Sequence, residues 1–435
     1  MIPRYTTPEM AQIWSDEARY ENWFRVELAA LIALENQKEI PAGVGQKLKH
    51  EAQKINWKNL ANRALEIENT TRHDVIAFLS ALEEVLGEDS RWLHLGLTSS
   101  DVVDTAFAYS LQKSALQIGQ RLTALTKILF EQAQKYKHTV CLARTHGQAA
   151  EPTTFGLKLL SFAVEMQRNE ERLQAAIREI AHGKLSGAVG NYGNIDPRIE
   201  EAVMLELGLV PEVVSTQVVP RDRHAIFFGT LAVIAGGLER LAVEIRHLMR
   251  SEVAEAFEPF GKGQRGSSAM PHKKNPILTE NVTGLARLIR SYAMAAYENQ
   301  ALWHERDISH SSVERVIAPD ATAVLDFALL RMTQVMSGLE VDAENMQKHL
   351  DATQGLIFSE SILLMLAKKG ILRQTAYEWV QRAAMNAREG QGDFLSNLKK
   401  DTEIKKVLAA KDIDEALDVK HHLRHIDAIF DRVKR

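Results

Sequence analysis

The chain has 435 residues, of which 45% are hydrophobic and 25% are charged, a composition ordinary for a globular protein of two or three domains. Its formal net charge of −4 argues against a protein that binds nucleic acid by neutralising many phosphates, and no basic cluster indicates a membrane surface. The single cysteine, Cys141, excludes an internal disulfide and a thiolate zinc site.

The amino-terminal segment MIPRYTTPEM lacks the apolar core of a signal peptide. The longest nearly apolar run, from Phe227 to Leu238, is too short to cross a bilayer. Together with the single cysteine, these features lead us to expect a cytoplasmic protein with neither membrane nor nucleic-acid partners.

Apolar residues at alternating spacings of three and four predict five long helices. Their seams, in chain order, are Leu111, Ala115, Ile118, Leu122, Leu125 and Leu129; Phe155, Leu159, Phe162 and Met166; Phe227, Leu231, Ile234, Leu238, Leu241, Ile245 and Leu248; Leu285, Leu288, Tyr292 and Ala295; and Leu325, Leu329, Met332, Met336 and Leu339. No helix can bury such a stripe alone, so the seams predict an all-α bundle, within one chain or between several. The best strand signal, the Val-rich segment 210–220, is weakened by its prolines.

Polar segments interrupt the helical pattern at 87–104, 139–154, 183–222 and 257–276. The third contains its own short helix, with Asp196 as the N-cap, Pro197 at the first position and Gly208 at the end. The other three combine Gly or Pro with Ser, Thr, His, Arg and Lys. Loops held by a rigid scaffold are where chemistry is usually carried, so these three are the candidate functional segments.

The first of these segments contains LHLGLTSSD, which supplies His94, Thr98 and Ser99. In the structural interpretation, Ser99 or Ser100 is simply the N-cap of the following helix. In the functional one, the same helix N-terminus binds an anion. Both interpretations are compatible.

A triplet of ionisable residues, Arg72-His73-Asp74, lies in a run that otherwise reads as helical. Taken alone, it is typical of a solvated helix face.

In the segment ARTHGQAAEP, His146 stands just before Gly147 and ahead of a predicted long helix. A lone histidine is more often structural than catalytic, but a neighbouring glycine lets the backbone approach a ligand closely.

The last segment includes GKGQRGSSAMPHKKNP at 261–276. It matches no phosphate-binding P-loop, and neither Ser267 nor Ser268 has the lysine spacing of a serine β-lactamase. A flexible linker does not need Lys273 or Asn275, whereas a mobile lid that brings a serine and positive charge to an anion would use them. From the residues alone, linker and lid remain equally supported.

Three motifs together resemble the aspartase/fumarase superfamily: TSSDVVDT (98–105), RTHGQAAEPTTFG (144–156) and GSSAMPHKKNP (266–276). Within that superfamily the resemblance is to the adenylosuccinate lyase family, of which His272 in MPHK is typical. Supporting matches are IPRY (2–5), TRHDV (71–75), STQVVPRDRH (215–224) and WHERDISHSSVER (303–315). One small departure is Lys274, where the bacterial family more often has arginine; the positive charge is kept.

The resemblance implies three all-α domains, roughly 1–98, 99–346 and 347–435. It also implies a homotetramer in which the central helices of four subunits associate and each active site draws loops from three chains. The family requires no cofactor and no metal. His421, His422 and His425 are accordingly interpreted as structural, in spite of their i, i+4 pair.

The resemblance further implies a β-elimination that releases fumarate from adenylosuccinate, giving AMP, and from the succinyl-carboxamide imidazole ribotide of purine synthesis. By similarity, Ser267 is the general base and His146 the general acid, whose ordinary pKa suits proton transfer at neutral pH. A serine alkoxide needs nearby N–H groups and positive charge, for which Lys273 is the expected source.

The remaining motif residues are expected to bind substrate, which carries a phosphate and two carboxylates. Positions matching the nucleotide-contacting residues are Arg4, Tyr5, Arg72, His73 and Asp74; those matching the surroundings of the succinyl group are Thr98, Ser99, Ser268, Lys273 and Asn275; Gln217, Asn281, Arg306, Ser311 and Arg315 complete the set. His94 is expected to orient the substrate or to support His146. Glu280 is expected to pair with His146, as a carboxylate orients a catalytic histidine.

Two other classes of protein compete with this interpretation. A non-enzymatic helical assembly protein would explain the apolar seams but not the polar segments. A sibling lyase acting on argininosuccinate is the closer alternative, and His272 with the IPRY and TRHD matches opposes it.

Overall fold

The structure of the chain is a computed structural model that describes residues 2–261, 263, 270 and 272–433. Contacts divide the chain into two compact units, each assembled from three segments. Unit 1 consists of residues 1–124, 168–240 and 281–332, and unit 2 of residues 125–167, 241–280 and 333–435. The three-domain division, with boundaries after residues 98 and 346, stays a prediction.

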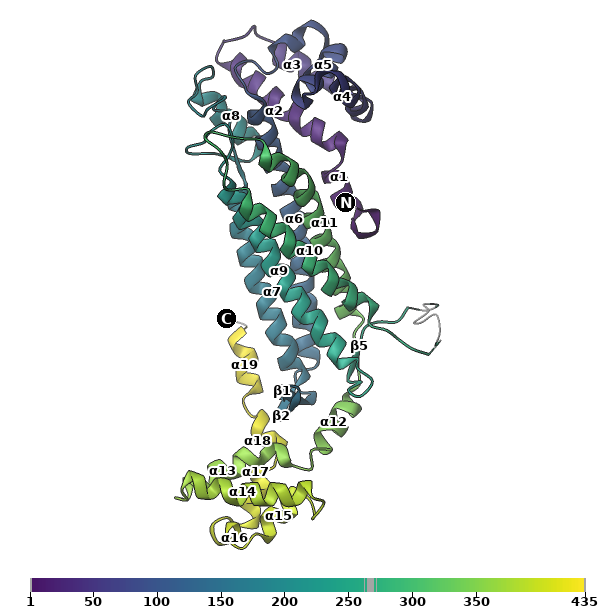
Figure 1. Ribbon diagram of the computed structural model, residues 1–435, viewed down its shortest axis with the longest axis vertical. Helices are drawn as coiled ribbons and strands as arrows, with labels where there is room; N and C mark the ends of the chain where they lie inside the picture. Colours follow the sequence, from purple (N-terminus) through teal and green to yellow (C-terminus); the bar gives the residue numbers. More distant parts are fainter. Residues whose placement is uncertain (1, 262, 264–269, 271, 434–435) are drawn as a thin grey trace. The chain divides into compact units, whose positions relative to one another are not determined.

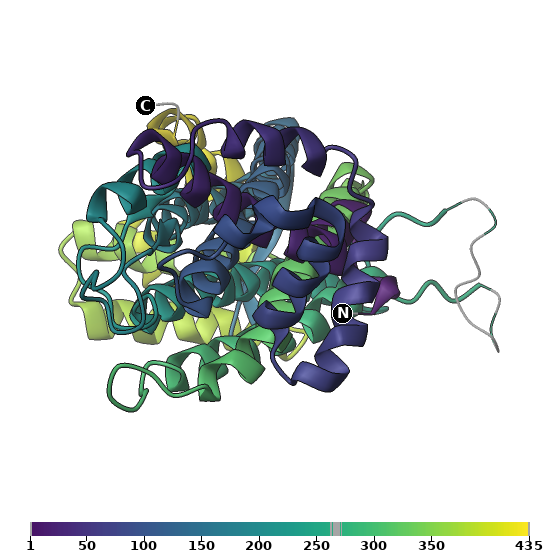
Figure 2. The same cartoon turned by 90° about the horizontal axis from the view of Figure 1, so that it is seen from above.

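Five long helices carry the architecture, and they correspond to the five predicted seams. They are α6 (Ser99–Lys135), α7 (Phe155–Ile180), α9 (Arg221–Leu248), α10 (Ile277–Glu298) and α11 (Ser309–Ser337). Figure 1 labels these helices, and Figure 2 shows the same cartoon from above. Every seam residue of α6 and α9 is at most 3% exposed, and such burial stabilises a fold by about 25 cal/mol per Å² of apolar surface. The all-α prediction is confirmed.

The buried face of α10 differs from the predicted one. Leu288 is 44% exposed, and Tyr292 and Ala295 are only partly buried. The buried stripe is instead Val282, Leu285, Ala286, Ile289, Ala293 and Ala296. Beyond Leu285 it lies one residue further along the chain than the predicted stripe, and both keep spacings of three and four, so periodicity alone fits either face.

Within α9, residues Asp222–Leu248 are long and apolar enough to pass for a membrane span by length and composition. Half of the most apolar window is buried inside the chain. A core helix has the same composition, and Leu231, Ile234 and Leu238 are buried as core residues are. The helix therefore gives no independent indication of a membrane.

The other elements of unit 1 surround the ends of its long helices. They are η1 (Pro3–Tyr5), α1 (Pro8–Ile13), α2 (Asp16–Asn36), α3 (Val44–Ala52), α4 (Trp57–Thr71), α5 (Asp74–Leu86), η2 (Gly87–Trp92), β3 (His182–Gly183), α8 (Pro197–Leu207) and β4 (Val210–Pro211). Tyr20 and Trp23 of α2 each contact Phe78 of α5 at ring-centroid distances of 5.5 Å, at the centre of a buried aromatic cluster. This cluster fixes α2 against α5.

The predicted short helix is present as α8. Asp196 caps it by accepting a hydrogen bond from the Arg198 amide, Pro197 is its first residue, and Gly208 ends it with φ +67°. A left-handed residue after the last turn favours glycine, which explains why the helix stops here.

Unit 2 contains a two-stranded hairpin and a helical carboxy-terminal part. Its elements besides the long helices are β1 (Val140–Thr145), β2 (Gln148–Thr154), β5 (Ala256–Phe257), β6 (Glu340–Val341), α12 (Ala343–Asp351), η3 (Leu356–Phe358), α13 (Ser359–Lys368), α14 (Arg373–Arg388), α15 (Phe394–Lys400), α16 (Ile404–Val407), α17 (Ala410–Ala416), α18 (Val419–Leu423) and α19 (Ile426–Val433). Ile362, Leu366, Phe394 and Leu398 belong to the core of the carboxy-terminal part. His422 packs against Phe358 and its Nε2 lies 3.0 Å from Ser361 Oγ, consistent with the structural interpretation of this histidine.

Candidate active site

A cavity of about 680 Å³ in unit 1 gathers residues from five separate parts of the sequence. Nine of the predicted binding residues line it: Arg72, His73, Asp74, Thr98, Ser99, Gln217, Arg306, Ser311 and Arg315. Three guanidinium groups, two hydroxyl-bearing serines and a threonine can hold phosphate or carboxylate groups. The structure thus brings these side chains together, while their role in binding stays a prediction.

The Arg72-His73-Asp74 triplet forms the junction between two helices, not part of a continuous helix face as the sequence suggested. Arg72 ends α4 in the left-handed region, with φ +53°. His73 caps α5, its Nδ1 accepting the Ile76 amide at 3.4 Å, and Asp74 is the first residue of α5. The chain turns here because the left-handed residue breaks the helix, so the triplet projects at a helix end where ligands commonly bind.

Asp74 connects this junction to α11. Arg315 Nη2 donates to Asp74 Oδ2 at 2.5 Å, and Arg315 Nε lies 3.5 Å from Ser311 Oγ. The Arg315 side chain is 54% exposed, so solvent screens this ion pair and its main effect is on side-chain orientation rather than on stability.

The start of α6 places Thr98 and Ser99 at the cavity. The helix begins at Ser99, so Ser99 and Ser100 lie in its first turn and the expected cap position belongs to Thr98. The Thr98 amide donates to Asp101 Oδ2 at 2.8 Å. Asp101 is fully buried and is also paired with Lys184, which anchors the helix start from behind.

Gln217 and Arg306 meet across the cavity wall, where Arg306 Nη1 donates to Gln217 Oε1 at 3.0 Å. Arg306 Nε is buried and has no hydrogen-bond partner among the residues that the structure describes. The pair lies ahead of two long helices, Gln217 before α9 and Arg306 before α11.

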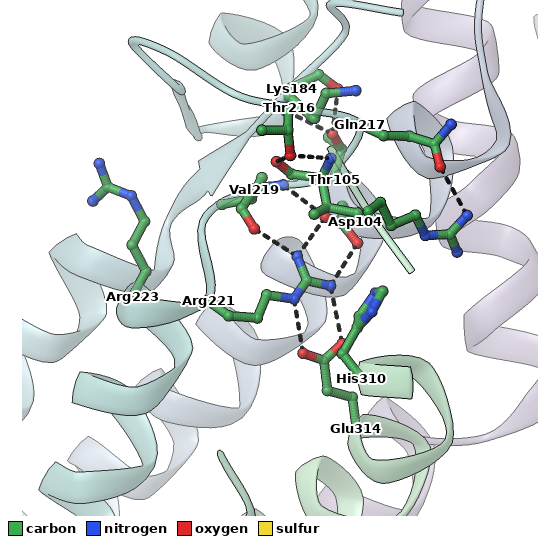
Figure 3. A network of polar contacts seen from close by, with 12 residues as sticks. Asp104, Thr105, Lys184, Thr216, Gln217, Val219, Arg221, Arg223, His310 and Glu314 are labelled. Atoms are coloured by element: carbon green, nitrogen blue, oxygen red, sulfur yellow. Dashed lines mark hydrogen bonds and ion pairs between the residues drawn. The ribbon is translucent and has the colours of Figure 1, made fainter. Parts of the chain in front are cut away.

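Behind these residues lies a buried network centred on Arg221 (Figure 3). Its guanidinium donates to both oxygens of Asp104, at 2.6 and 3.0 Å, and to both oxygens of Glu314, at 2.9 and 3.0 Å. The Val219 carbonyl accepts a fifth bond at 2.7 Å. Asp104 and Glu314 line the cavity.

The two carboxylates of this network differ in acidity. Burial opposes ionisation of Asp104, but the charge and hydrogen bonds of Arg221 prevail and hold its pKa well below the usual range. At Glu314 burial dominates and raises the pKa to about 7 in spite of Arg221. Asp104 is therefore the firm counter-ion of Arg221 at neutral pH.

Two buried histidines lie beside this network and are uncharged at neutral pH. Burial, reinforced by the nearby charge of Arg221, lowers the pKa of His224 to about 3 and that of His310 to about 4. His224 stacks on Phe107 with ring centroids 5.6 Å apart. His310 lines the cavity, and its Nδ1 has no hydrogen-bond partner within the described part of the chain.

A second group of predicted binding residues in unit 1 does not line the cavity. Tyr5 packs edge-on against Phe327 of α11, with ring centroids 5.4 Å apart. The Arg331 guanidinium lies 4.5 Å from the same ring and donates to Asn281 Oδ1 at 2.6 Å. Arg4, beside Tyr5, is exposed. Arg4, Tyr5 and Asn281 are therefore not among the residues that line the cavity.

His94 is also absent from the cavity lining. Its Nδ1 lies 2.6 Å from Oε1 of the buried Glu27, and its backbone amide donates to Oε2 of the same carboxylate at 2.7 Å. Burial alone would lower the pKa of His94, but the bond to Glu27 and its charge raise it overall. The described contacts therefore give His94 a structural partner.

In unit 2, His146 lies at the tip of the β1–β2 hairpin. Thr145 pairs with Gln148, and the two residues between them, His146 and Gly147, have φ +54° and +76°. Positive φ at both central positions is typical of a type I′ turn, which matches the twist of the strands. His146 is exposed at this turn.

The hairpin is anchored two residues before His146. Arg144 donates two hydrogen bonds to Glu255, which is 1% exposed, and Nδ1 of His349 on α12 lies 2.7 Å from the same carboxylate. The positive charge of Arg144 and the fork geometry match a buried carboxylate well. The anchor fixes the strand that carries the histidine.

Lys273, Asn275 and Glu280 lie at the carboxyl end of the fourth polar segment and the start of α10. Lys273 and Glu280 are exposed. Among the described residues, Glu280 makes no hydrogen bond or ion pair to His146 within this chain, so that pairing stays a prediction. Ser267 and Ser268 lie outside the residues that the structure describes.

The two ends of this segment are tied together by Glu258. Its buried carboxylate accepts the amides of Leu278 and Thr279, at 3.0 and 3.1 Å, and the Thr279 hydroxyl at 3.0 Å. A carboxylate that accepts the first amides of a helix acts as a cap, and its negative charge interacts favourably with the positive end of the helix dipole.

Sequence reasoning missed the residues behind the site. Arg221, Glu314 and Glu255 were not singled out, although the first two stand inside quoted motifs. The sequence shows that Arg221 directly follows Pro220, but not that its side chain is buried. No sequence signal links it to Asp104, from which it is 117 residues distant.

Two family models match the chain. A model described as lyase covers residues 3–290, and one described as adenylosuccinate lyase C-terminus covers residues 355–433. An adenylosuccinate lyase of Thermotoga maritima is 49% identical over 435 residues and is covered completely, as is this chain.

Solved structures support the fold. A fumarate lyase from Mesorhizobium sp. BNC1 aligns with a TM-score of 0.90 at 24% identity, covering 100% of this chain and 99% of that one. A 3-carboxy-cis,cis-muconate lactonizing enzyme from Pseudomonas putida aligns with a TM-score of 0.87 at 27% identity, covering 98% and 96%. The helical architecture is thus that of the aspartase/fumarase type.

Proposed function

The chain belongs to the adenylosuccinate lyase family, and we propose that it releases fumarate from adenylosuccinate, leaving AMP, and from the succinyl-aminoimidazole carboxamide ribotide, leaving AICAR. The observation that carries this proposal is the cavity of unit 1, where nine motif residues converge. Its guanidinium and hydroxyl groups suit a phosphate and carboxylates, and Trp14, Trp23 and Phe107 add apolar lining.

In the proposed reaction a base removes a proton from the succinyl methylene carbon. The electron pair of that C–H bond becomes the new C=C bond of fumarate, and the C–N bond breaks with its electrons going to nitrogen. Ser267 is the proposed base, supported by the charge of Lys273, and His146 is the proposed acid that protonates the leaving nitrogen. Negative charge that develops on the carboxylate requires pre-positioned donors.

The binding roles follow from the groupings in the structure. Arg72, His73, Asp74 and the residues of α11 are proposed to hold the nucleotide, while Thr98 and Ser99 at the start of α6 receive a succinyl carboxylate. Arg4 and Tyr5 are proposed to contact the nucleotide of an active site completed by another subunit. No cofactor or metal is required.

We also propose a homotetramer in which active sites are shared between subunits. Apolar side chains on the long helices support this, since Ile226, Val233, Met294 and Val316 are each more than half exposed. The exposed position of His146 and the separate placement of Tyr5 and Asn281 are what a site assembled from several chains requires. A cytoplasmic location is proposed with it.

The activity is tested by incubating the purified protein with adenylosuccinate and following the ultraviolet absorbance as AMP forms. Conversion with release of fumarate is expected. A well-folded protein that produces no spectral change at high enzyme concentration would rule out this function and favour a non-enzymatic assembly protein.

Shared active sites are tested by mixing variants. His146→Asn and Ser267→Ala are each expected to be inactive, and mixed oligomers are expected to regain part of the activity, because some sites then contain both intact residues. Native mass spectrometry verifies that subunits have exchanged. Absence of recovery in verified mixed oligomers would contradict the shared-site proposal.

A further inference from the structure

Three segments that carry proposed binding residues meet at one buried arginine. Thr98 and Ser99 start α6, Gln217 precedes α9, and Ser311 lies in the first turn of α11. These segments are far apart in the sequence, yet all line the same cavity. Contacts between the segments are therefore needed to fix their relative positions.

Arg221 contacts all three segments and uses every donor it has. Two of its bonds reach Asp104 on α6 through both carboxylate oxygens, and two reach Glu314 on α11 in the same way. The fifth returns to the Val219 carbonyl, just after Gln217. The Val219 amide in turn donates to Asp104 at 2.9 Å, which closes the network (Figure 3).

The network is buried and lies close to each binding residue. The side chain of Arg221 is 1% exposed, that of Asp104 5% and that of Glu314 8%. Asp104 follows Ser99 by five residues and Glu314 follows Ser311 by three, so each carboxylate lies about one helical turn from a binding residue. Two bidentate pairs fix rotation as well as distance, which a single hydrogen bond does not.

Arg221 also compensates negative charge at the cavity wall. Asp104 and Glu314 face the cavity, and a substrate with a phosphate and two carboxylates would be repelled by uncompensated negative charge there. The guanidinium does not line the cavity itself, so it acts on the ligand only through its partners.

We propose that Arg221 is a positioning residue that aligns the three substrate-binding segments and compensates the carboxylates of the cavity wall. The proposal rests on the proposed function, because it assigns the cavity to the nucleotide and a succinyl carboxylate of the substrate. It predicts that damage to Arg221 weakens nucleotide binding more than the chemical step.

The chain offers a matched control in Arg223, two residues further along α9 (Figure 3). Arg223 donates to Glu212 at 2.6 and 3.2 Å and to Glu179 at 2.9 Å. None of these three residues lines the cavity. Arg223 therefore has the same chemistry and a similar number of carboxylate bonds, without a connection to the binding residues.

The test compares Arg221→Lys with Arg223→Lys, since lysine keeps the charge but lacks the planar fork. Calorimetric titration with AMP and steady-state kinetics with adenylosuccinate are run at a temperature where both variants are folded. For Arg221→Lys we expect AMP affinity to fall and KM to rise at least 10-fold, with kcat changed less than 3-fold. For Arg223→Lys we expect AMP affinity, KM and kcat all to stay within 2-fold of the wild type, whatever its melting temperature.

A double-mutant cycle separates positioning from general damage. If Arg221 acts through Gln217, then Gln217→Ala costs less AMP affinity in the Arg221→Lys background than in the wild type, while the two changes add when Gln217→Ala is combined with Arg223→Lys. Additivity in both cycles would overturn the proposal, as would an Arg221→Lys variant with unchanged KM.

If Arg221→Lys does not fold, Glu314→Gln replaces it, because this change keeps the shape and leaves the Asp104 clamp intact. A rise in KM of at least 3-fold with little change in kcat is then expected, and an unchanged KM would overturn the proposal. Wild-type protein that neither binds AMP nor cleaves adenylosuccinate would instead refute the proposed function itself.

Discussion

Arg144 donates two hydrogen bonds, at 2.6 and 3.1 Å, to the buried carboxylate of Glu255. Arg144 lies two residues before His146, which is in the turn of the hairpin. The contact joins strand β1 to the chain just before β5, and His349 on α12 completes it from a third segment. A proton donor must reach a leaving nitrogen within hydrogen-bond distance, so a fixed hairpin is an advantage for the proposed acid.

We predict that Glu255→Gln lowers both stability and kcat. The change leaves Arg144 without a charged partner. Breaking a fully buried ion pair costs about 3 to 5 kcal/mol, and the loss here is expected to be smaller because the Arg144 side chain is 28% exposed. Urea denaturation at fixed protein concentration and steady-state kinetics measure the two effects. Glu244→Gln is the matched control, since Glu244 pairs with Lys158 in the same unit and both are part-exposed. Equal losses in the two variants would contradict a specific role for Glu255.

His146→Asn is predicted to lower kcat on adenylosuccinate by a factor of roughly 10² to 10⁴, the usual contribution of a general acid, with a smaller change in KM. Its side chain is exposed at the turn, so stability should hardly change. His138→Asn is the control, because that histidine is also exposed in unit 2. A loss of activity as large in His138→Asn would show that the effect is not specific to the turn.

Glu258→Ala is predicted to destabilise the chain by about 1 to 2 kcal/mol, because two amides of the first turn of α10 and the Thr279 hydroxyl lose their acceptor. Glu258→Gln keeps one acceptor oxygen and should cost less. Thermal melting of the three proteins measures this order. Equal melting temperatures for Glu258→Ala and the wild type would disprove the capping role.

Stability should fall in acid because of His224. Its pKa is lowered to about 3 by burial and by Arg221, so between pH 3 and about 6.5 the unfolded chain binds a proton that the folded chain does not. The folded state is therefore fully favoured above pH 6.5 and loses stability as the pH falls, by about 2 kcal/mol at pH 5 from this group. His310 contributes in the same direction.

His224→Phe should remove part of this slope, since phenylalanine can keep the stacking on Phe107 and does not titrate. Urea denaturation at pH 5 and pH 7.5 gives the comparison. The difference between the two pH values should shrink relative to the wild type, while His138→Gln, at an exposed position, should leave it unchanged. An undiminished slope in His224→Phe would contradict a neutral buried imidazole.

Much of the fold was predictable because apolar periodicity directly reports burial. The seams of α6 and α9 are buried as expected, and the caps of α8 follow from Asp196, Pro197 and Gly208. The β1–β2 hairpin was not predicted. Its strand β2 reads QAAEPTT, which has no alternating apolar pattern, and its exposed surface gives no burial signal to detect.

The site was predictable only in part. Motifs identified the residues that reach the cavity, but periodicity cannot show which distant side chains hold them in place. Arg221 is 117 residues from Asp104 and 93 from Glu314, and such ion pairs depend on the packed arrangement of three helices. The junction at Arg72 was missed for a related reason, since a left-handed arginine has no sequence signature comparable to glycine.

A competition experiment asks whether this chain acts on adenylosuccinate or on argininosuccinate. Adenylosuccinate and argininosuccinate are supplied together at equal concentration, and AMP, arginine and fumarate are quantified by chromatography as the reaction proceeds. AMP and fumarate are expected to appear in equal amounts, with no arginine formed. Arginine formed with fumarate, without AMP, would contradict it and assign the chain to the sibling lyase.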